Sequence, residues 1–151
     1  MLPSDSHSVL ETLNLHCTPR PGQPTNPCAQ HILIVDDNHL VRRIVRANLE
    51  AATGFICYEA VDGLDAILKA RESKPQLIIM DLAMPVTNGF EAALALRREM
   101  PEIPVVLLTL YAEVVPPGER VWVKAVVAKS QGLAALIDCV QNILAAPDEP
   151  K

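Results

Sequence analysis

The chain has 151 residues, of which half are hydrophobic, 21% are charged and 3% are aromatic. This length suits one domain with an aliphatic core, and this composition excludes a chain that is disordered throughout. The formal net charge of −5 argues against a protein that binds nucleic acid or an anionic membrane.

Residues 1–30 differ in composition from the rest of the chain. They hold five of the 13 prolines, and residues 18–27 are too rich in proline for a helix or a central strand. A capping-box pattern at residues 8–11 permits one short helix, which is marginal on its own. We therefore predict a flexible Pro-rich leader over residues 1–30, with an arm that becomes ordered on a partner as the alternative.

Five short apolar runs follow the leader. Four of them contain β-branched residues and lack polar interruptions, and the one at 55–58 is weaker. Such runs are typical of strands buried on both faces, as in a parallel sheet. The runs are residues 32–35, 55–58, 77–80, 105–108 and 125–128.

Apolar residues at helical spacing separate these runs. The first stripe comprises Leu40, Val41, Ile44, Val45 and Leu49, with Arg42, Arg43, Arg46 and Glu50 opposite. The later stripes comprise Leu64, Ile67 and Leu68; Phe90, Ala93 and Leu94; and Leu133, Leu136, Ile137, Val140 and Leu144. This alternation over residues 31–146 predicts a doubly wound α/β domain with right-handed crossovers.

The helix after the fourth strand is the exception. Residues 112–120 must form it, yet Pro116, Pro117 and Gly118 lie in the middle of this segment. A proline inside a helix costs about 3 kcal/mol or more. We therefore expect a shortened or broken fourth helix.

The cysteines and the hydropathy pattern indicate in which cellular compartment the protein is expected. Cys17, Cys28, Cys57 and Cys139 lack the spacing of a zinc or redox motif, and the last two lie in apolar segments. The first 15 residues do not have the pattern of a signal peptide, and no apolar run approaches the roughly 18 residues of a membrane span. We expect reduced thiols, a cytoplasmic protein and no membrane association.

The candidate site residues stand directly after four of the runs. They are Asp36 and Asp37 after the first, Asp81 after the third, Thr109 after the fourth and Lys129 after the fifth. Parallel sheets bind ligands at the carboxyl ends of their strands, near a switch in strand order, so these side chains can converge on one crevice. Taken alone, each has a simpler alternative as a helix cap, a turn residue, a strand end or a surface lysine.

The chemistry of this set indicates a metal and an anion. Three packed carboxylates repel one another, and a divalent cation removes that repulsion. Mg²⁺ prefers oxygen ligands and retains several waters, so two or three carboxylates with one backbone carbonyl suit it. A lysine and a threonine beside the metal indicate a tetrahedral anion. Asp81 can then attack a phosphoryl group and carry it as an acyl phosphate.

The sequence around these residues resembles the receiver domain of two-component response regulators. The matching segments are residues 32–37, 80–85 and 88–89, together with Thr109 and Lys129. The resemblance covers about residues 31–146 and leaves residues 147–151 as a C-terminal tail. It implies a five-stranded parallel sheet with the flavodoxin-like strand order 2-1-3-4-5.

The resemblance also implies the roles of the acidic residues. Asp81 accepts a phosphoryl group from a histidine kinase or a phosphotransfer protein. Asp37 and Asp81 bind Mg²⁺ directly, together with the backbone carbonyl of Ala83, whereas Asp36 holds a metal-bound water.

Further roles follow from the same resemblance. Thr109 and Lys129 contact the phosphoryl oxygens, and Pro85 and Gly89 shape the loop and the helix start beside the acceptor. The helix that carries Arg42 is where this family docks its phosphodonor.

The sequence departs from the family pattern at the output side and at the mouth of the site. Val126 replaces an aromatic switch residue, and Leu110 replaces a small residue. Leu110 is expected to slow phosphoryl entry unless it turns away to pack against residues 112–120. Ser130 replaces the proline that usually follows the lysine. A non-proline cis peptide costs about 2.5–4 kcal/mol, so we expect a trans Lys129–Ser130 bond that displaces the Lys129 ammonium or the start of the last helix.

Four functions compete for this pattern. The preferred one is a stand-alone phosphoacceptor domain whose output is contact with an unknown downstream protein or phosphate shuttling, without a nucleic-acid or membrane partner. A phosphatase or phosphotransferase would need a second acid where Ala83 stands, so we expect no catalysis beyond self-phosphorylation and dephosphorylation. A nucleotide-binding module would need a glycine-rich loop after the first strand. A pseudo-receiver that signals without phosphorylation is the remaining alternative, favoured by the altered switch positions.

Overall fold

The computed structural model describes residues 30–82, 84, 89–110, 112–120 and 123–145. Apart from Gln30, the predicted leader lies outside these residues, as does the predicted C-terminal tail. The domain boundaries at 30 and 146 therefore stay predictions. Among the described helices, none combines the length and the hydrophobicity that crossing a bilayer requires.

Five parallel strands form one sheet in the order β2-β1-β3-β4-β5. They are β1 (His31–Val35), β2 (Ile56–Ala60), β3 (Leu77–Met80), β4 (Val105–Thr109) and β5 (Ala125–Ala128). The predicted sheet and its order are confirmed. The chain passes from β1 outward to β2 and then returns to the other side of β1 for β3. The switch in strand order therefore lies between β1 and β3.

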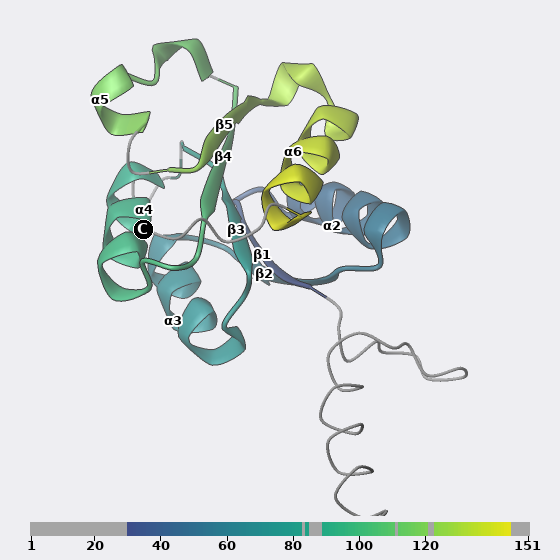
Figure 1. Ribbon diagram of the computed structural model, residues 1–151, viewed down its shortest axis with the longest axis horizontal. Helices are drawn as coiled ribbons and strands as arrows, with labels where there is room; N and C mark the ends of the chain where they lie inside the picture. The colour runs from purple at the N-terminus through teal and green to yellow at the C-terminus, as the bar shows by residue number, and fades with distance from the viewer. Residues whose placement is uncertain (1–29, 83, 85–88, 111, 121–122, 146–151) are drawn as a thin grey trace, which may run out of the picture. The chain divides into compact units, whose positions relative to one another are not determined.

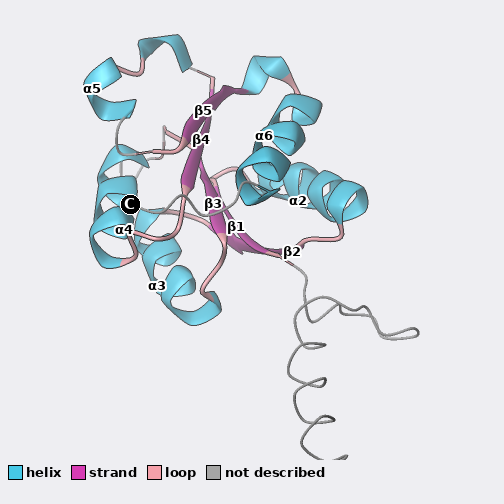
Figure 2. Ribbon diagram, in the orientation of Figure 1, coloured by secondary structure: helices cyan, strands magenta, loops and turns pink. Residues whose placement is uncertain are grey.

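Helices cover both faces of the sheet, as Figure 1 and Figure 2 show. α2 (His39–Thr53) and α6 (Leu133–Ala145) lie together on one face, and α3 (Gly63–Ser73) and α4 (Gly89–Glu99) lie together on the other. The predicted doubly wound α/β architecture is therefore confirmed.

Alternate side chains of the strands enter two separate cores. Along β1, Ile32 and Ile34 pack with residues of α2 and α6, whereas Leu33 and Val35 pack with residues of α3 and α4. Each of these four side chains is at most 1% exposed. Burial on both faces explains why the run contains no polar residue.

α2 begins at a side-chain cap and ends at a glycine. The side-chain oxygen of Asn38 accepts hydrogen bonds from the backbone N–H groups of Leu40 and Val41, at 2.9 and 3.3 Å. Gly54, with a φ of 75°, adopts the left-handed conformation that glycine tolerates best and ends the helix. The turn between β1 and α2 consequently consists of residues 36–38, which places two aspartates at the end of the central strand.

The buried face of α2 differs from the predicted apolar stripe. Leu40 and Ile44 are 65% and 51% exposed, whereas Arg42, predicted on the polar face, is only 8% exposed. The guanidinium of Arg42 tolerates burial because it hydrogen-bonds to the Glu59 carboxylate and to the backbone carbonyl of Asp36. The prediction for these three α2 positions was therefore wrong.

The predicted stripe of α3 was wrong at Leu64 and Leu68, whereas Ile67 packs against the core. Leu64 and Leu68 are 63% and 55% exposed, and the helix instead buries Ala66 and Ala70 completely. Small side chains at the contact allow a helix to approach its neighbours closely, so the larger residues remain at the periphery.

Two aliphatic residues of α2 test this assignment of buried and exposed positions. Leu49→Ala is expected to lower the free energy of unfolding by about 2–5 kcal/mol, because the fully buried side chain would leave a cavity. Ile44→Ala is expected to change it by less than about 0.5 kcal/mol, because Ile44 is half exposed. Urea denaturation of both variants measures the difference, and equal losses would contradict the orientation of α2.

The segment after β4 contains a short 3₁₀ turn, η1 (Ala112–Val114), and the four-residue helix α5 (Pro117–Arg120). The predicted broken helix is confirmed. Pro117 occupies the first position of α5, where its missing N–H removes no helical hydrogen bond. The Arg120 guanidinium donates to the carbonyls of Ala112 and Val115, at 2.9 and 3.2 Å, and ties the two pieces together.

Candidate functional site

Three carboxylates meet at the carboxyl edge of the sheet. Asp36 and Asp37 follow β1 and Asp81 follows β3, and these two strands are hydrogen-bonded neighbours. One carboxylate oxygen of each residue lies within 4.8 Å of the other two. Asp36 and Asp81 are buried and Asp37 is exposed, so the cluster is open to solvent at Asp37.

The side chain of Lys129 reaches this cluster from the end of the edge strand β5. It follows β5, yet its Nζ lies 3.1 Å from Asp36 Oδ2 and 3.6 Å from Asp81 Oδ1. One ammonium against three carboxylates leaves an excess of two negative charges. This excess is the charge that a divalent cation would neutralise.

Asp36 takes part in the turn as well as in the cluster. Its Oδ1 accepts a hydrogen bond from the Asn38 backbone N–H at 2.8 Å, and its own N–H donates to the Ala60 carbonyl at 3.2 Å. The N-cap of α2 is Asn38. Capping of that helix, the simpler alternative for Asp36 and Asp37, is therefore performed by a different residue.

Thr109 and Leu110 stand at the end of β4. Thr109 is completely buried, and its register partner in β5 is Ala128, the residue before Lys129. The structure thus places Thr109 at the same carboxyl edge as Lys129. Leu110 is 61% exposed, which does not fit the alternative that it packs against residues 112–120. Val126 is partly buried against the core beneath α3 and α4.

The connection from β5 to α6 shows how the chain accommodates Ser130. The Lys129–Ser130 peptide is trans, as expected. A 3₁₀ turn, η2 (Lys129–Gln131), follows, and Gly132 with a φ of 89° leads into α6 at Leu133. The ammonium nevertheless remains at the acidic cluster. The flexible side chain of lysine reaches the carboxylates from this backbone. That the trans bond displaces the ammonium or the start of the last helix from the usual family position stays a prediction.

The first residue of α4 packs directly on the backbone of the cluster. The Gly89 N–H donates to the Leu82 carbonyl at 3.0 Å. A Cβ on Gly89 would lie 2.4 Å from the Asp81 carbonyl oxygen, a distance that no side chain can adopt. Glycine is therefore required beside Asp81. The predicted site residues Ala83 and Pro85 lie outside the described residues.

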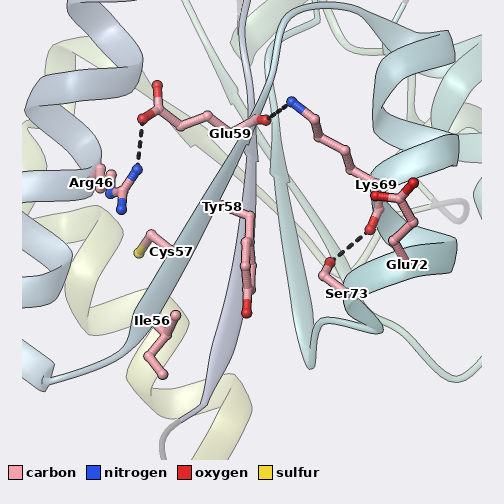
Figure 3. A pocket seen from close by; sticks show the side chains of 8 residues that line it. All are labelled: Arg46, Ile56, Cys57, Tyr58, Glu59, Lys69, Glu72 and Ser73. Carbon is pink, nitrogen blue, oxygen red and sulfur yellow. Dashed lines mark hydrogen bonds and ion pairs between the residues drawn. The ribbon is translucent and has the colours of Figure 1, made fainter. Parts of the chain in front are cut away.

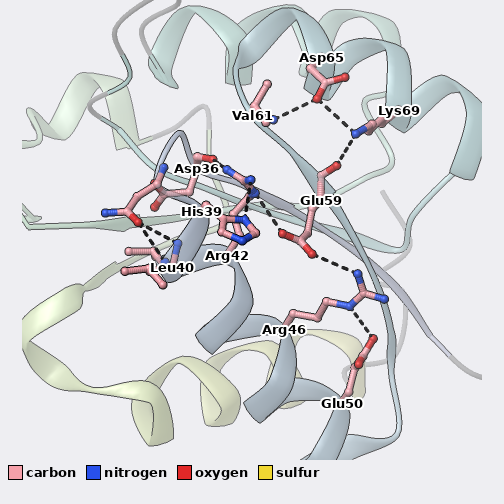
Figure 4. A network of polar contacts seen from close by, with 12 residues as sticks. Asp36, His39, Leu40, Arg42, Arg46, Glu50, Glu59, Val61, Asp65 and Lys69 are labelled. Carbon is pink, nitrogen blue, oxygen red and sulfur yellow. Dashed lines mark hydrogen bonds and ion pairs between the residues drawn. The ribbon is translucent and has the colours of Figure 1, made fainter.

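Asp36 also joins a network of charged side chains that helical periodicity does not predict, shown in Figure 4. Arg42 donates to the Asp36 carbonyl at 2.7 Å and to Glu59 Oε1 at 3.0 Å, and Arg46 donates to Glu59 Oε2 at 3.1 Å. Burial opposes ionisation of Glu59, but the hydrogen bonds from Arg46 and Arg42 outweigh it and hold the pKa of Glu59 below its ordinary value. The only signal in the sequence was a charged residue directly after the weakest apolar run.

The same network reaches the outer side of β2 and the start of α3. The Lys69 ammonium donates to the backbone carbonyl of Glu59 at 2.6 Å and lies 3.3 Å from the Asp65 carboxylate. Asp65 Oδ2 in turn accepts the backbone N–H of Val61 at 3.0 Å. Charged side chains and two backbone carbonyls, those of Asp36 and Glu59, thus form one connected network from the acidic turn to the edge of the sheet, as Figure 4 shows.

A groove along the edge strand β2 is separate from the acidic cluster, since none of the residues that line it belongs to the cluster (Figure 3). Cys57 lies in this groove, and burial raises the pKa of its thiol to about 12. A thiol with such a pKa is not ionised near neutral pH and is a poor nucleophile. Cys57 therefore gives the groove no reactive group.

Fold and site together define a receiver-type signalling domain, a parallel doubly wound sheet with acids and a lysine at its carboxyl edge. The response regulator receiver domain family matches residues 32–141, and the chain belongs to this family. Receiver domains are in general signalling modules rather than enzymes.

Similar curated proteins are response regulators. Response regulator protein VraR of Staphylococcus epidermidis is 40% identical over 83 residues, which are 54% of this chain and 40% of that protein. Response regulator GacA of Pseudomonas protegens is 33% identical over 117 residues, which are 76% of this chain and 55% of that protein. The chain therefore spans about half the length of these relatives.

Solved structures of response regulators share the fold. TrrA of Thermotoga maritima, crystallised with Mg²⁺-BeF, has a TM-score of 0.71 at 26% identity, over 76% of this chain and 98% of that chain. The chemotaxis protein CheY4 of Vibrio cholerae has a TM-score of 0.68 at 27% identity, over 76% and 98%. Both comparisons confirm the flavodoxin-like receiver fold.

Proposed function

We propose that the chain is the phosphoacceptor receiver of a two-component or phosphorelay system, with Asp81 as the acceptor. The observation that carries the proposal is the position of the Asp81 carboxylate, 3.6 Å from the Lys129 ammonium and beside two further acids. A phosphoryl group is anionic, so a nucleophilic carboxylate needs fixed positive charge next to it. Lys129 supplies one such charge, and Thr109 is the proposed second contact to the phosphoryl oxygens.

Mg²⁺ is the proposed cofactor, and the residues present fit it. The cluster offers hard oxygen ligands and an excess of negative charge, which are the properties that Mg²⁺ requires. Asp37, Asp81 and the carbonyl of Ala83 would hold the ion directly, and Asp36 would hold it through a water. Bound there, the ion supplies further positive charge to the phosphoryl oxygens. The presence of Mg²⁺-BeF in the TrrA structure supports this assignment.

In this proposal, the chain's own side chains have the following roles in the transfer. A carboxylate oxygen of Asp81 forms a bond to phosphorus while the bond between phosphorus and the donor breaks, which gives an acyl phosphate. Lys129, which pairs with Asp36 and Asp81, is the proposed partner of the transferred oxygens. Water later cleaves the acyl phosphate and releases phosphate. Self-phosphorylation and self-dephosphorylation are the only catalysis in this proposal.

The proposed donor is a histidine kinase or a phosphotransfer protein, docking at α2. This helix begins directly after the acidic turn and exposes Leu40 and Ile44. The proposed output is contact with a downstream protein in the cytoplasm. The net charge of −5 favours protein partners over nucleic acid or an anionic membrane for this domain.

A pseudo-receiver that signals without phosphorylation is the second candidate. Val126 favours it, because valine has no aromatic ring that could change position when the site is occupied. The acidic cluster and the lysine favour the first candidate, since a protein that never binds phosphate has no need for them.

Acetyl phosphate distinguishes the two candidates. With Mg²⁺, the chain is expected to gain about 80 Da, the mass of one phosphoryl group held as an acyl phosphate. With EDTA in place of Mg²⁺, we expect no gain. Intact-mass spectrometry measures both reactions, and peptide mapping locates the group. A folded chain that gains no mass with Mg²⁺ would favour the pseudo-receiver.

Leu110→Ala is expected to increase the rates of phosphate loading and of phosphate loss together. The exposed leucine directly follows Thr109 at the end of β4, where we propose that the mouth of the site lies. A displacement of about 1 Å in an in-line reaction can cost on the order of 10²-fold in rate. The free energy of unfolding is expected to change by less than about 0.5 kcal/mol, because the side chain is exposed. Time-resolved mass spectrometry gives the rates, and urea denaturation gives the stability. A large loss of stability with unchanged rates would show a packing role instead.

A further inference from the structure

Arg42 is a charged side chain that α2 holds inside the protein. It is 8% exposed, whereas Arg43 and Arg46 of the same helix are exposed. Burying a guanidinium is unfavourable unless its donors find partners. The hydrogen-bond partners of Arg42 therefore indicate which part of the structure the buried guanidinium stabilises.

Each part of the Arg42 guanidinium has a neighbour. Nη1 donates to the Asp36 carbonyl at 2.7 Å, Nε donates to Glu59 Oε1 at 3.0 Å, and Nη2 lies 3.4 Å from Nδ1 of His39. The shortest of these contacts goes to the backbone of the acidic turn (Figure 4). One side of the guanidinium thus hydrogen-bonds to the Glu59 carboxylate, and the other side hydrogen-bonds to the Asp36 carbonyl. The planar group suits this arrangement because it presents donors in fixed, divergent directions.

The Asp36 carbonyl is a sensitive point in the turn. It belongs to the peptide unit that joins Asp36 to Asp37, so rotation of this unit would change ψ of Asp36 and φ of Asp37, the backbone angles beside both carboxylates. The other polar groups of Asp36 are already engaged by Ala60, Asn38 and Lys129. Arg42 supplies the contact to the remaining polar group of Asp36, its carbonyl oxygen.

We propose that Arg42 is a positioning residue which, clamped by Glu59, fixes the Asp36–Asp37 peptide unit and thereby aims both carboxylates into the site. Its consequence for metal affinity rests on the proposed function. Partners that orient metal ligands change metal affinity by about 10- to 100-fold when they are removed. Arg42 acts through Asp36 and need not touch metal or phosphate.

The test compares Arg42→Met with Arg46→Met. Arg46 is a matched control, because it lies one turn later on α2 and also donates to Glu59, but its other partner is Glu50 and not the acidic turn. We expect Arg42→Met to weaken Mg²⁺ binding about tenfold by calorimetry, and Arg46→Met to leave it within about twofold. Arg42→Lys keeps the charge and is expected to give an intermediate loss, which provides a second variant if Arg42→Met does not fold.

A second measurement needs no metal. The Asn38 amide donates to Asp36 Oδ1, so its ¹⁵N–¹H resonance reports the orientation of that carboxylate. In metal-free protein, Arg42→Met is expected to shift this resonance and speed its hydrogen exchange, whereas Arg46→Met is not. Equal behaviour of the two variants in both measurements would overturn the inference and leave the proposed function standing. A wild-type chain that binds no Mg²⁺ would overturn the proposed function. The Asn38 amide resonance would still show whether Arg42 orients Asp36.

Discussion

Asp81→Asn is expected to abolish the gain of about 80 Da that acetyl phosphate and Mg²⁺ give the wild-type chain. A carboxamide has no nucleophilic oxygen that could form an acyl phosphate. The substitution also removes one of the three negative charges that would attract the cation. Intact-mass spectrometry over a time course measures the loss, which we expect to be complete.

Asp138→Asn is the matched control for this result. Asp138 lies on the exposed side of α6 and is not part of the acidic cluster. The control is expected to gain mass as the wild-type chain does, and far-UV circular dichroism shows whether both variants are folded. Undiminished labelling of Asp81→Asn would place the acceptor on another residue.

Gly89→Ala is expected to have the second largest effect. The added Cβ would lie 2.4 Å from the Asp81 carbonyl oxygen and 2.8 Å from the Leu82 Cα. Both neighbours are backbone atoms that cannot rotate aside, so α4 or the acceptor strand end must move. We expect a rate of phosphorylation about 10²-fold lower, because the reaction tolerates little misplacement. The free energy of unfolding is expected to fall by about 1–3 kcal/mol from overpacking.

Gly118→Ala provides the comparison for this variant. A Cβ at Gly118 in α5 would meet no atom within 4 Å. Its labelling rate is expected to equal that of the wild-type chain. If Gly89→Ala reacted as fast as Gly118→Ala, the close packing of α4 on Asp81 could not be a requirement of the site.

The fold could be predicted because a strand buried on both faces has a direct signature in sequence. Residues 32–35 show it, with four apolar side chains at most 1% exposed. The position of the site followed from the same reasoning. A polar residue directly after such a run must lie at the carboxyl edge of the sheet, however the helices pack. Asp36 and Asp81 are brought together in this way.

The orientation of the helices could not be predicted, because it depends on partners from other elements. Leu40 and Ile44 fit an apolar stripe as well as Leu49 does, yet only Leu49 is buried. Arg42 takes an inner position because Glu59, 17 residues away, lies there to receive it. Helical periodicity contains no information about such a pairing. The acids of the site could therefore be predicted from the sequence, but the network of Arg42 and Glu59 that contacts the acidic turn could not.

The charged network along β2 has a consequence for association between molecules. β2 is an edge strand, and unpaired backbone groups at an edge can recruit a strand from another chain and start aggregation. Here Glu50 accepts the Cys57 N–H at 3.3 Å, Lys69 donates to the Glu59 carbonyl, and Asp65 accepts the Val61 N–H. A strand that docked on this edge would have to displace three charged side chains and desolvate them. The sheet thus ends in groups that water solvates well and that another strand cannot easily replace.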